Sequence, residues 1–154
     1  MKTYTYFVIF SIDQEKFAVP YESVIEATKS VEIIPLPYLT RRIHGIINFH
    51  GKIIPVINLR KILRKTEKNI SITDSLIVVN SIENALIAIV ADAVHELFRP
   101  HQKDITKIDE ILPSYTFYEG TIKAGDILIP IVNTDKLLGK KDKLKLEEEN
   151  LTIN

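Results

Sequence analysis

The sequence predicts an all-β fold, either a barrel or a sandwich, and three observations support this prediction. Apolar runs of about five to seven residues, rich in isoleucine and valine, alternate with polar turns, which is typical of β-strands. Long stretches with helical spacing are scarce, so helices are expected to be few and short. A segment of 19 residues recurs 75 residues later in the chain, which indicates two similar halves and favours two small barrels.

The repeated segment is residues 45–63, GIINFHGKIIPVINLRKIL, and its second copy is residues 120–138, GTIKAGDILIPIVNTDKLL. Each copy predicts a β-hairpin with a glycine in its turn, followed by a short helix. Asn58 is expected to cap the first of these helices, and Pro55 to lie at an edge, a bulge or a strand bend. In one register the copies share a glycine, a proline, an asparagine and a lysine, at Gly45 and Gly120, Pro55 and Pro130, Asn58 and Asn133, and Lys61 and Lys136.

The segment before the first copy predicts a hairpin and an extended connection. Residues 6–12 and 17–20 are apolar runs on either side of a polar turn, so they are expected to pair. Residues 21–27 fit either one helical turn or a strand. Residues 31–37 are expected to be extended, because each proline in them restricts the residue that it follows.

The segment between the copies predicts a second hairpin. Residues 75–80 and 85–91 form it through a turn at 81–84, and residues 94–98 follow as a further short strand. Three other segments are expected to lack long strands. Residues 64–74 form a polar boundary between the halves, and residues 103–117 form irregular structure that covers a barrel end. Residues 140–154 form a charged tail that is at best a loosely docked helix.

Composition narrows the class of protein. At 154 residues the chain fits one domain or two very small ones. Its 20 basic and 20 acidic residues balance, so no bulk charge attracts nucleic acid or an anionic membrane. The absence of cysteine excludes disulfides, thiolate metal sites and thiol nucleophiles. No apolar run is long enough for a membrane span, so a cytoplasmic protein without direct membrane insertion is expected.

Motifs for chemistry are missing from the chain. There is no phosphate-binding loop, nucleophile elbow or zinc-protease signature, so we expect neither an enzyme nor a cofactor. The four histidines have no spacing that sets up a metal site, and no metal is expected. Asp92 lies between two apolar runs and is interpreted as a strand-end or bulge residue that accepts backbone hydrogen bonds.

Several ordered blocks resemble one family. Residues 17–20 read FAVP, Val24 to Glu26 match a V-x-E segment, and residues 51–60 read GKIIPVINLR, similar to a G-x-I-x-P-x-x-D-L-R block. Residues 43–48 and 90–94 are similar to further blocks, in the same order. Across residues 4–138 the sequence resembles CheW, the adaptor family of bacterial chemotaxis.

The resemblance implies a fold and a role. Residues 1–140 would form one domain of two five-stranded SH3-like barrels around a shared core, with the first strand able to pair in the second barrel, and residues 141–154 a tail. The role would be a non-catalytic adaptor between methyl-accepting chemoreceptors and the CheA histidine kinase. The regulatory domain of the kinase would dock barrel end to barrel end, and receptors would contact the groove between the barrels.

The same resemblance places the partner contacts on two short segments. The expected protein-binding residues are Val24 and Glu26 on the first segment, and Asn48, Phe49, His50 and Gly51 on the second. The family commonly has N-L-R-G where this chain has residues 48–51, so His50 replaces an arginine. Asn58 likewise stands where aspartate is usual. An arginine is charged at any cellular pH, whereas an ordinary histidine is mostly neutral at pH 7.

Two alternatives remain open from the residues. One is a divergent adaptor of the same family that serves another signalling or motility pathway, as the histidine in the turn suggests. The other is a small β-barrel that binds nucleic acid or a ligand, which would need a basic face studded with aromatic residues. Zero net charge and the lack of tryptophan argue against that second class.

Overall fold

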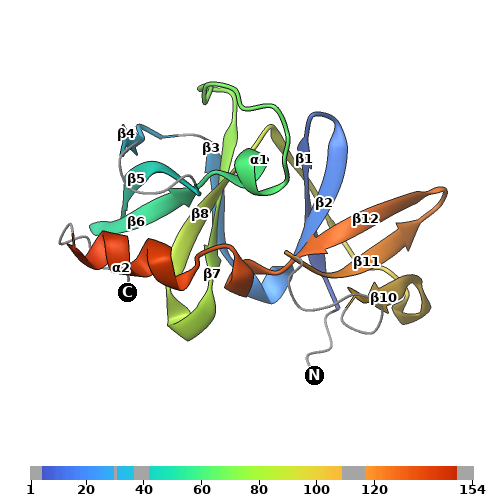
Figure 1. Ribbon diagram of the computed structural model, residues 1–154. Coiled ribbons are helices and arrows are strands. Elements are labelled where there is room, and N and C mark those ends of the chain that lie inside the picture. The colour runs from blue at the N-terminus through green and yellow to red at the C-terminus, as the bar shows by residue number, and fades with distance from the viewer. Residues whose placement is uncertain (1–4, 30, 37–41, 109–116, 149–154) are drawn as a thin grey trace.

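A computed structural model describes residues 5–29, 31–36, 42–108 and 117–148, and these form two six-stranded sheets with a few short helices (Figure 1). We call them barrel 1, ordered β3-β7-β8-β6-β5-β4, and barrel 2, ordered β10-β11-β12-β2-β1-β9. The strands of barrel 1 are β3 (Val24–Lys29), β4 (Ile34–Pro35), β5 (Ile43–Phe49), β6 (Lys52–Ile57), β7 (Ser75–Asn80) and β8 (Leu86–Ala91). Those of barrel 2 are β1 (Phe7–Ile12), β2 (Glu15–Pro20), β9 (Ala93–Phe98), β10 (Ile105–Lys107), β11 (Tyr118–Ala124) and β12 (Ile127–Val132). The all-β prediction is confirmed.

Each sheet has one strand more than the five that were expected. The additional strands are β4, with two residues, and β10, with three. Strands this short leave no apolar alternation in the sequence, so β10 was missed inside the segment 103–117 that was expected to be irregular. Ile108 is buried at this end of barrel 2, as expected of a covering residue, whereas residues 109–116 lie outside the described residues.

The two barrels share one pairing scheme. In barrel 1, β3 pairs with β7 and β7 with β8 antiparallel, β8 with β6 parallel, and β6 with β5 and β5 with β4 antiparallel. Barrel 2 repeats this sequence of pairings as β9, β1, β2, β12, β11 and β10. The sequence repeat is therefore a structural repeat, with each copy forming the hairpin next to the parallel pair.

The shared glycines are explained by a close approach of two backbones. A Cβ atom at Gly45 would lie 2.1 Å from the carbonyl oxygen of Ile34 in β4, and one at Gly120 would lie 2.6 Å from that of Thr106 in β10. No side chain fits in either place, so the short strands can pair only where the neighbouring strand has glycine. The glycine repeat thus marks the positions of β4, which lies within the segment 31–37 that was expected to be extended, and of β10, which the sequence did not reveal.

The order of strands along the chain differs between the barrels. Barrel 1 is continuous from β3 to β8, whereas barrel 2 takes β1 and β2 from the N-terminal segment and β9 to β12 from the second half. The polar stretch 64–74 connects elements of barrel 1, so the expectation that it separates the barrels is wrong. The chain passes between barrels after β2 and again at Asp92, between β8 and β9.

The helical elements follow the sequence closely. Helix α1 (Leu59–Ile62) is capped by Asn58, whose side chain accepts a hydrogen bond from the backbone N–H of Lys61 at 3.1 Å, which confirms the cap prediction. Residues 21–27 contain both of the predicted alternatives, because a 3₁₀ turn at Tyr21–Ser23 is followed by the strand β3. Helix α2 (Lys140–Glu148) docks more firmly than expected, because Leu146 is fully buried.

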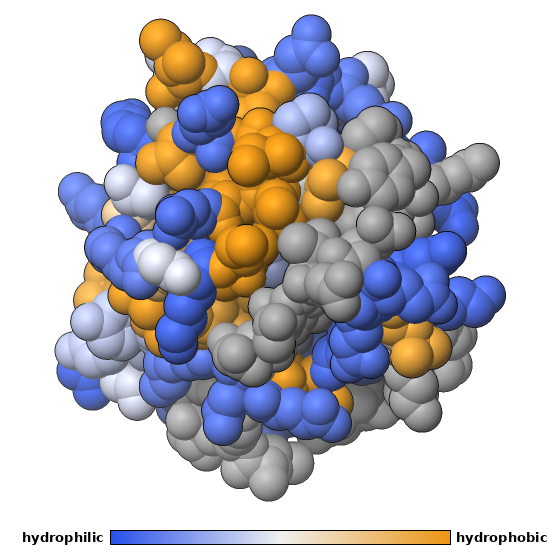
Figure 2. All heavy atoms as spheres, turned by 90° about the vertical axis from the view of Figure 1, so that its left-hand side faces the viewer, coloured by the Kyte–Doolittle hydropathy of each residue, from blue (hydrophilic) through white to orange (hydrophobic). Residues whose placement is uncertain are grey.

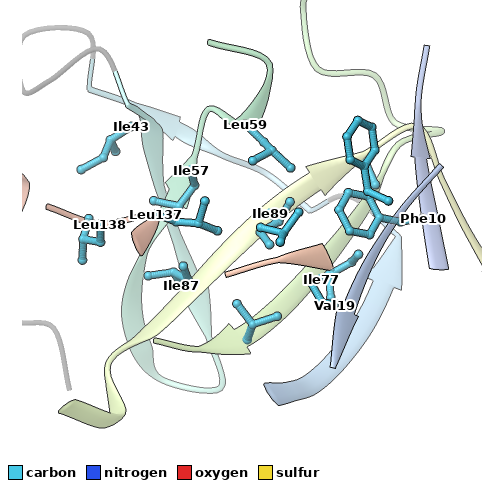
Figure 3. Packing of buried hydrophobic residues seen from close by; sticks show 14 of the residues in the cluster. Phe10, Val19, Ile43, Ile57, Leu59, Ile77, Ile87, Ile89, Leu137 and Leu138 are labelled. Atoms are coloured by element: carbon cyan, nitrogen blue, oxygen red, sulfur yellow. The ribbon is translucent and has the colours of Figure 1, made fainter. Parts of the chain in front are cut away.

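The largest core cluster lies between the two barrels. Figure 3 shows its side chains, with Phe10 and Val19 from barrel 2 facing Ile77 and Ile89 from barrel 1. Leu146 of α2 and Leu137 also belong to this cluster. Two smaller clusters fill the individual barrels. The barrels therefore fold against each other around one shared apolar layer, as the resemblance implied.

Candidate partner-binding surface

The six residues expected to bind partners come from two parts of barrel 1. Val24 and Glu26 belong to β3, at one edge of the sheet order. Asn48 and Phe49 end β5, and His50 and Gly51 form the turn to β6. The turn is four positions away from β3 in the sheet order, so the two parts approach each other only because the sheet curls into a barrel.

The curled sheet brings Glu26 and His50 together. The Nε2 atom of His50 lies 3.4 Å from the Oε1 atom of Glu26. The His50 side chain is 73% exposed and that of Glu26 is 43% exposed, so both remain accessible to a partner. An exposed pair of this kind contributes little to the stability of the fold, which leaves its two side chains available for recognition.

The turn itself has a strict backbone conformation. His50 and Gly51 have φ angles of 50° and 87°, the left-handed region that a two-residue type I′ hairpin turn requires at both positions. Asn48 braces the turn, because its Oδ1 atom accepts a hydrogen bond from the backbone N–H of Gly51 at 2.9 Å. The ring of Phe49 packs edge-on against that of His50 at 4.5 Å between centroids. The histidine is thus held at the tip of a rigid hairpin.

Val24 has a different environment from the other residues of the set. It is half-buried and packs against the core shared by the barrels. Phe49 is also half-buried and packs against the core of barrel 1. The exposed residues of the predicted set are therefore Glu26, Asn48, His50 and Gly51.

Sequence reasoning missed Ile25, which lies between the two residues predicted on β3. The register of β3 against β7 shifts between Val24 and Glu26, which marks a β-bulge at Ile25. Ile25 is 47% exposed and directly precedes Glu26 in β3. The only feature of the sequence at this point is an isoleucine between Val24 and Glu26, and this pattern does not predict a bulge.

Barrel 1 also exposes an apolar surface at its outer end. Figure 2 faces the end of the molecule where β4, β5 and β6 lie, and it shows apolar atoms gathered across the centre and hydrophilic residues around them. The exposed large apolar residues of barrel 1 and of the connection that follows α1 include Ile25, Val31, Ile34, Ile53, Ile72 and Ile82. An exposed apolar area with a polar rim is typical of a protein–protein contact.

The described residues contain neither a metal-binding cluster nor a membrane-spanning helix. Within residues 5–29, 31–36, 42–108 and 117–148, no group of three or more histidine or acidic side chains is arranged to hold a metal ion. None of the helices in this part of the chain has the length and apolar character needed to cross a bilayer.

Comparison with known proteins decides the family. The family profile described as CheW-like domain matches residues 6–142. The chain belongs to the CheW-like family. Chemotaxis protein CheW of Helicobacter pylori is 29% identical over 138 residues, which cover 88% of this chain and 82% of that protein. Chemotaxis protein CheW of Thermotoga maritima is 27% identical over 134 residues, which cover 84% of each chain.

A solved structure of a CheW protein extends the match to the fold. The crystal structure of the scaffolding protein TtCheW from Thermoanaerobacter tengcongensis superimposes with a TM-score of 0.81 at 28% identity, covering 99% of this chain and all of that one. The two SH3-like barrels expected from the CheW resemblance are thus the fold of this chain.

Proposed function

We propose that this chain is a non-catalytic chemotaxis scaffold that couples methyl-accepting chemoreceptors to a CheA-type histidine kinase. The observation that carries the proposal is the exposed pair of Glu26 and His50, which lies on the CheW fold where the family resemblance expects a receptor contact. The chemotaxis relatives and the scaffolding protein of like fold support the same role. The chain would act in the cytoplasm, where the kinase and the receptor tips lie.

The two partners would use different surfaces. We assign the receptor to the face formed by β3 and the β5–β6 turn, and the kinase regulatory domain to a barrel end. Ile34 and Ile72, which are exposed and lie outside β3 and the β5–β6 turn, support an apolar contact of this second kind. An adaptor of this design would work by holding its two partners next to each other.

Substitution of Glu26 tests the receptor contact. Glu26→Lys is expected to weaken capture by a receptor cytoplasmic fragment at least tenfold, because it places a cation beside His50 and removes the carboxylate. The fold should be unaffected, since an exposed charge change shifts stability by no more than about 0.5 kcal/mol. Glu147→Lys, an exposed residue on α2, is the matched control. Equal capture of both variants and wild type would contradict the assigned receptor face.

The histidine in the turn also permits a divergent adaptor of another signalling or motility pathway. His50→Arg places a permanently charged guanidinium, which can form bidentate hydrogen bonds, at the same position. If a partner carries an acidic group there, affinity should increase by about 1 kcal/mol or more, and if the partner has adapted to imidazole it should decrease by a similar amount. Titration calorimetry against receptor and kinase fragments measures the change. Unchanged affinity for both would remove His50 from the contact.

A further inference from the structure

A network of charged side chains joins the barrels on one side of their shared core. Arg60 is contributed by α1 in barrel 1, Asp13 by the β1–β2 turn in barrel 2, and Asp92 is the single residue between β8 and β9. One residue comes from each barrel and the third from the connection between them, so contacts among the three link the barrels.

Arg60 forms the centre of this network. Its side chain is 11% exposed, and its Nη1 atom donates to Asp13 Oδ1 at 2.9 Å and to the carbonyl oxygen of Thr66 at 3.0 Å. Its Nη2 atom donates to both carboxylate oxygens of Asp92, at 3.0 and 3.1 Å. A buried guanidinium with this many acceptors is fixed in direction as well as in position, because its donors lie in a rigid plane.

Asp92 is the acceptor on which the network converges. Besides Arg60, it accepts the backbone N–H of Asp13 at 2.8 Å, and the Nζ atom of Lys68 lies 3.2 Å from its Oδ1. Burial opposes ionisation of this carboxyl, but these donors outweigh burial and lower the pKa of Asp92. The expected role of Asp92 as an acceptor of backbone hydrogen bonds is confirmed, and its ion pairs to Arg60 and Lys68 were not foreseen.

The apolar core and the ion pairs restrain the barrels in different ways. Burial of apolar surface is non-directional and scales with area, whereas charge-assisted hydrogen bonds of a planar guanidinium fix both distance and angle. Among the described residues, a further buried polar contact between the barrels is the hydrogen bond from Ser81 Oγ to the carbonyl oxygen of Thr134 at 2.9 Å. The Arg60 network and the ion pair between Lys65 and Glu15 add further directional contacts between the barrels.

We propose that the network of Arg60, Asp13 and Asp92 is a joint that sets the orientation of barrel 1 relative to barrel 2. With the joint intact, the molecule presents the surfaces of both barrels at one fixed angle. Without it, each barrel keeps its fold and the shared core stays buried, but the angle between the barrels varies. Arg60 acts here as a positioning residue, since it lies at the junction and not among the residues assigned to partner contact.

Distances between the barrels test this proposal on the isolated chain. Because the sequence has no cysteine, a pair introduced as Lys29→Cys and Lys123→Cys, both at exposed positions, takes spin labels on one strand of each barrel. Arg60→Lys keeps the charge but loses the planar fork, and Asp92→Asn keeps the shape but loses the charge. Lys61→Gln, in the same helix with an exposed pair to Glu67 at 3.9 Å, is the matched control.

Pulsed spin-label measurements should give one narrow distance distribution for the wild type and the control. Both test variants should broaden the distribution about twofold while thermal unfolding stays cooperative, because the fixed geometry of the joint is lost. If Arg60→Lys does not fold, Asp92→Asn, whose side chain is 29% exposed, carries the test alone. An unchanged distribution in the folded variants would overturn the proposal.

One consequence rests on the proposed function. Variants with a loosened joint should bind receptor and kinase fragments separately with wild-type affinity, yet bridge the two poorly, since only some molecules present both surfaces at the required angle. Loss of binding to a single partner would speak against the assigned contact surfaces, whereas the distance measurement needs no partner. Failure of the joint and failure of the adaptor role are therefore distinguishable.

Discussion

Barrel 1 and barrel 2 are built on the same series of strand pairings, yet the chain reaches that arrangement by different routes. Barrel 1 is continuous in sequence, and barrel 2 is completed by the N-terminal hairpin of β1 and β2. Both barrels have glycine where a short strand approaches, proline one residue before the parallel pairing begins, and asparagine before the helical turn. These are the residues that the backbone geometry requires.

The positions at which the copies differ are informative about function. His50 in the turn of barrel 1 corresponds to Gly125 in barrel 2, which has a φ angle of 62°. Arg60, the centre of the joint, corresponds to the exposed Asp135. Glycine adopts a positive φ angle readily, whereas histidine does so less often. The copies thus differ at the residue proposed for partner contact and at the centre of the proposed joint.

The largest expected effect concerns α2, which extends the second copy and has no equivalent after the first. Leu146 is fully buried in the core between the barrels, so Leu146→Ala is expected to lower the free energy of unfolding by about 2–5 kcal/mol. Leu144, which is 57% exposed on the same helix, is the control and should shift stability by less than about 0.5 kcal/mol when changed to alanine. Equal small losses in urea unfolding would mean that α2 does not cover the core in solution.

The two glycines that face a short strand test whether the barrels respond alike. Gly45→Ala should destabilise the chain by about 1–3 kcal/mol, and Gly120→Ala by somewhat less, because the carbonyl oxygen that the new methyl group meets is farther away. Gly139, whose nearest contact would be the flexible end of Asp142 at 3.4 Å, is the control for alanine substitution. A reversed order of the two losses would indicate that β4 yields more easily than β10.

Much of this fold was accessible from the sequence, and the reasons differ from element to element. The repeat predicted both hairpins, and Asn58 predicted its helix, because these features depend on local geometry. The pairing of β1 within barrel 2 was expected from the family resemblance. The strand β10, the bulge at Ile25 and the ion pairs of Asp92 depend on contacts between distant segments, and no local pattern encodes those contacts.

The asparagine caps offer a smaller and symmetric test. Asn58 accepts a hydrogen bond from Lys61, and Asn133 Oδ1 accepts one from the backbone N–H of Asp135 at 3.0 Å. Alanine at either position should cost about 1 kcal/mol of stability. Asn58 also donates to Glu67 Oε1 at 2.7 Å, so its loss should be the larger of the two. Thermal unfolding of both single variants measures the difference, and a larger loss at Asn133 would contradict it.

The smallest effect is a pH dependence that barrel 1 should have through His44, which corresponds to Glu119 in barrel 2. Burial lowers the pKa of His44, and the charge of Glu67 opposes this only in part. Below the unfolded pKa of about 6.5 the unfolded chain therefore takes up a proton that the folded chain does not, so stability falls as pH falls. His44→Gln should reduce this loss between about pH 7 and pH 5. An unchanged slope in denaturant unfolding would show that His44 does not contribute.

Sedimentation velocity of this chain with a receptor cytoplasmic fragment and a kinase regulatory domain tests most directly whether one copy bridges both partners. The proposed function predicts a ternary complex that sediments faster than either binary complex and is absent when the chain is left out. Glu26→Lys should leave the complex with the kinase domain intact and remove the receptor from it. A mixture in which the wild-type chain binds neither partner, or binds only one at a time, would contradict the bridging role.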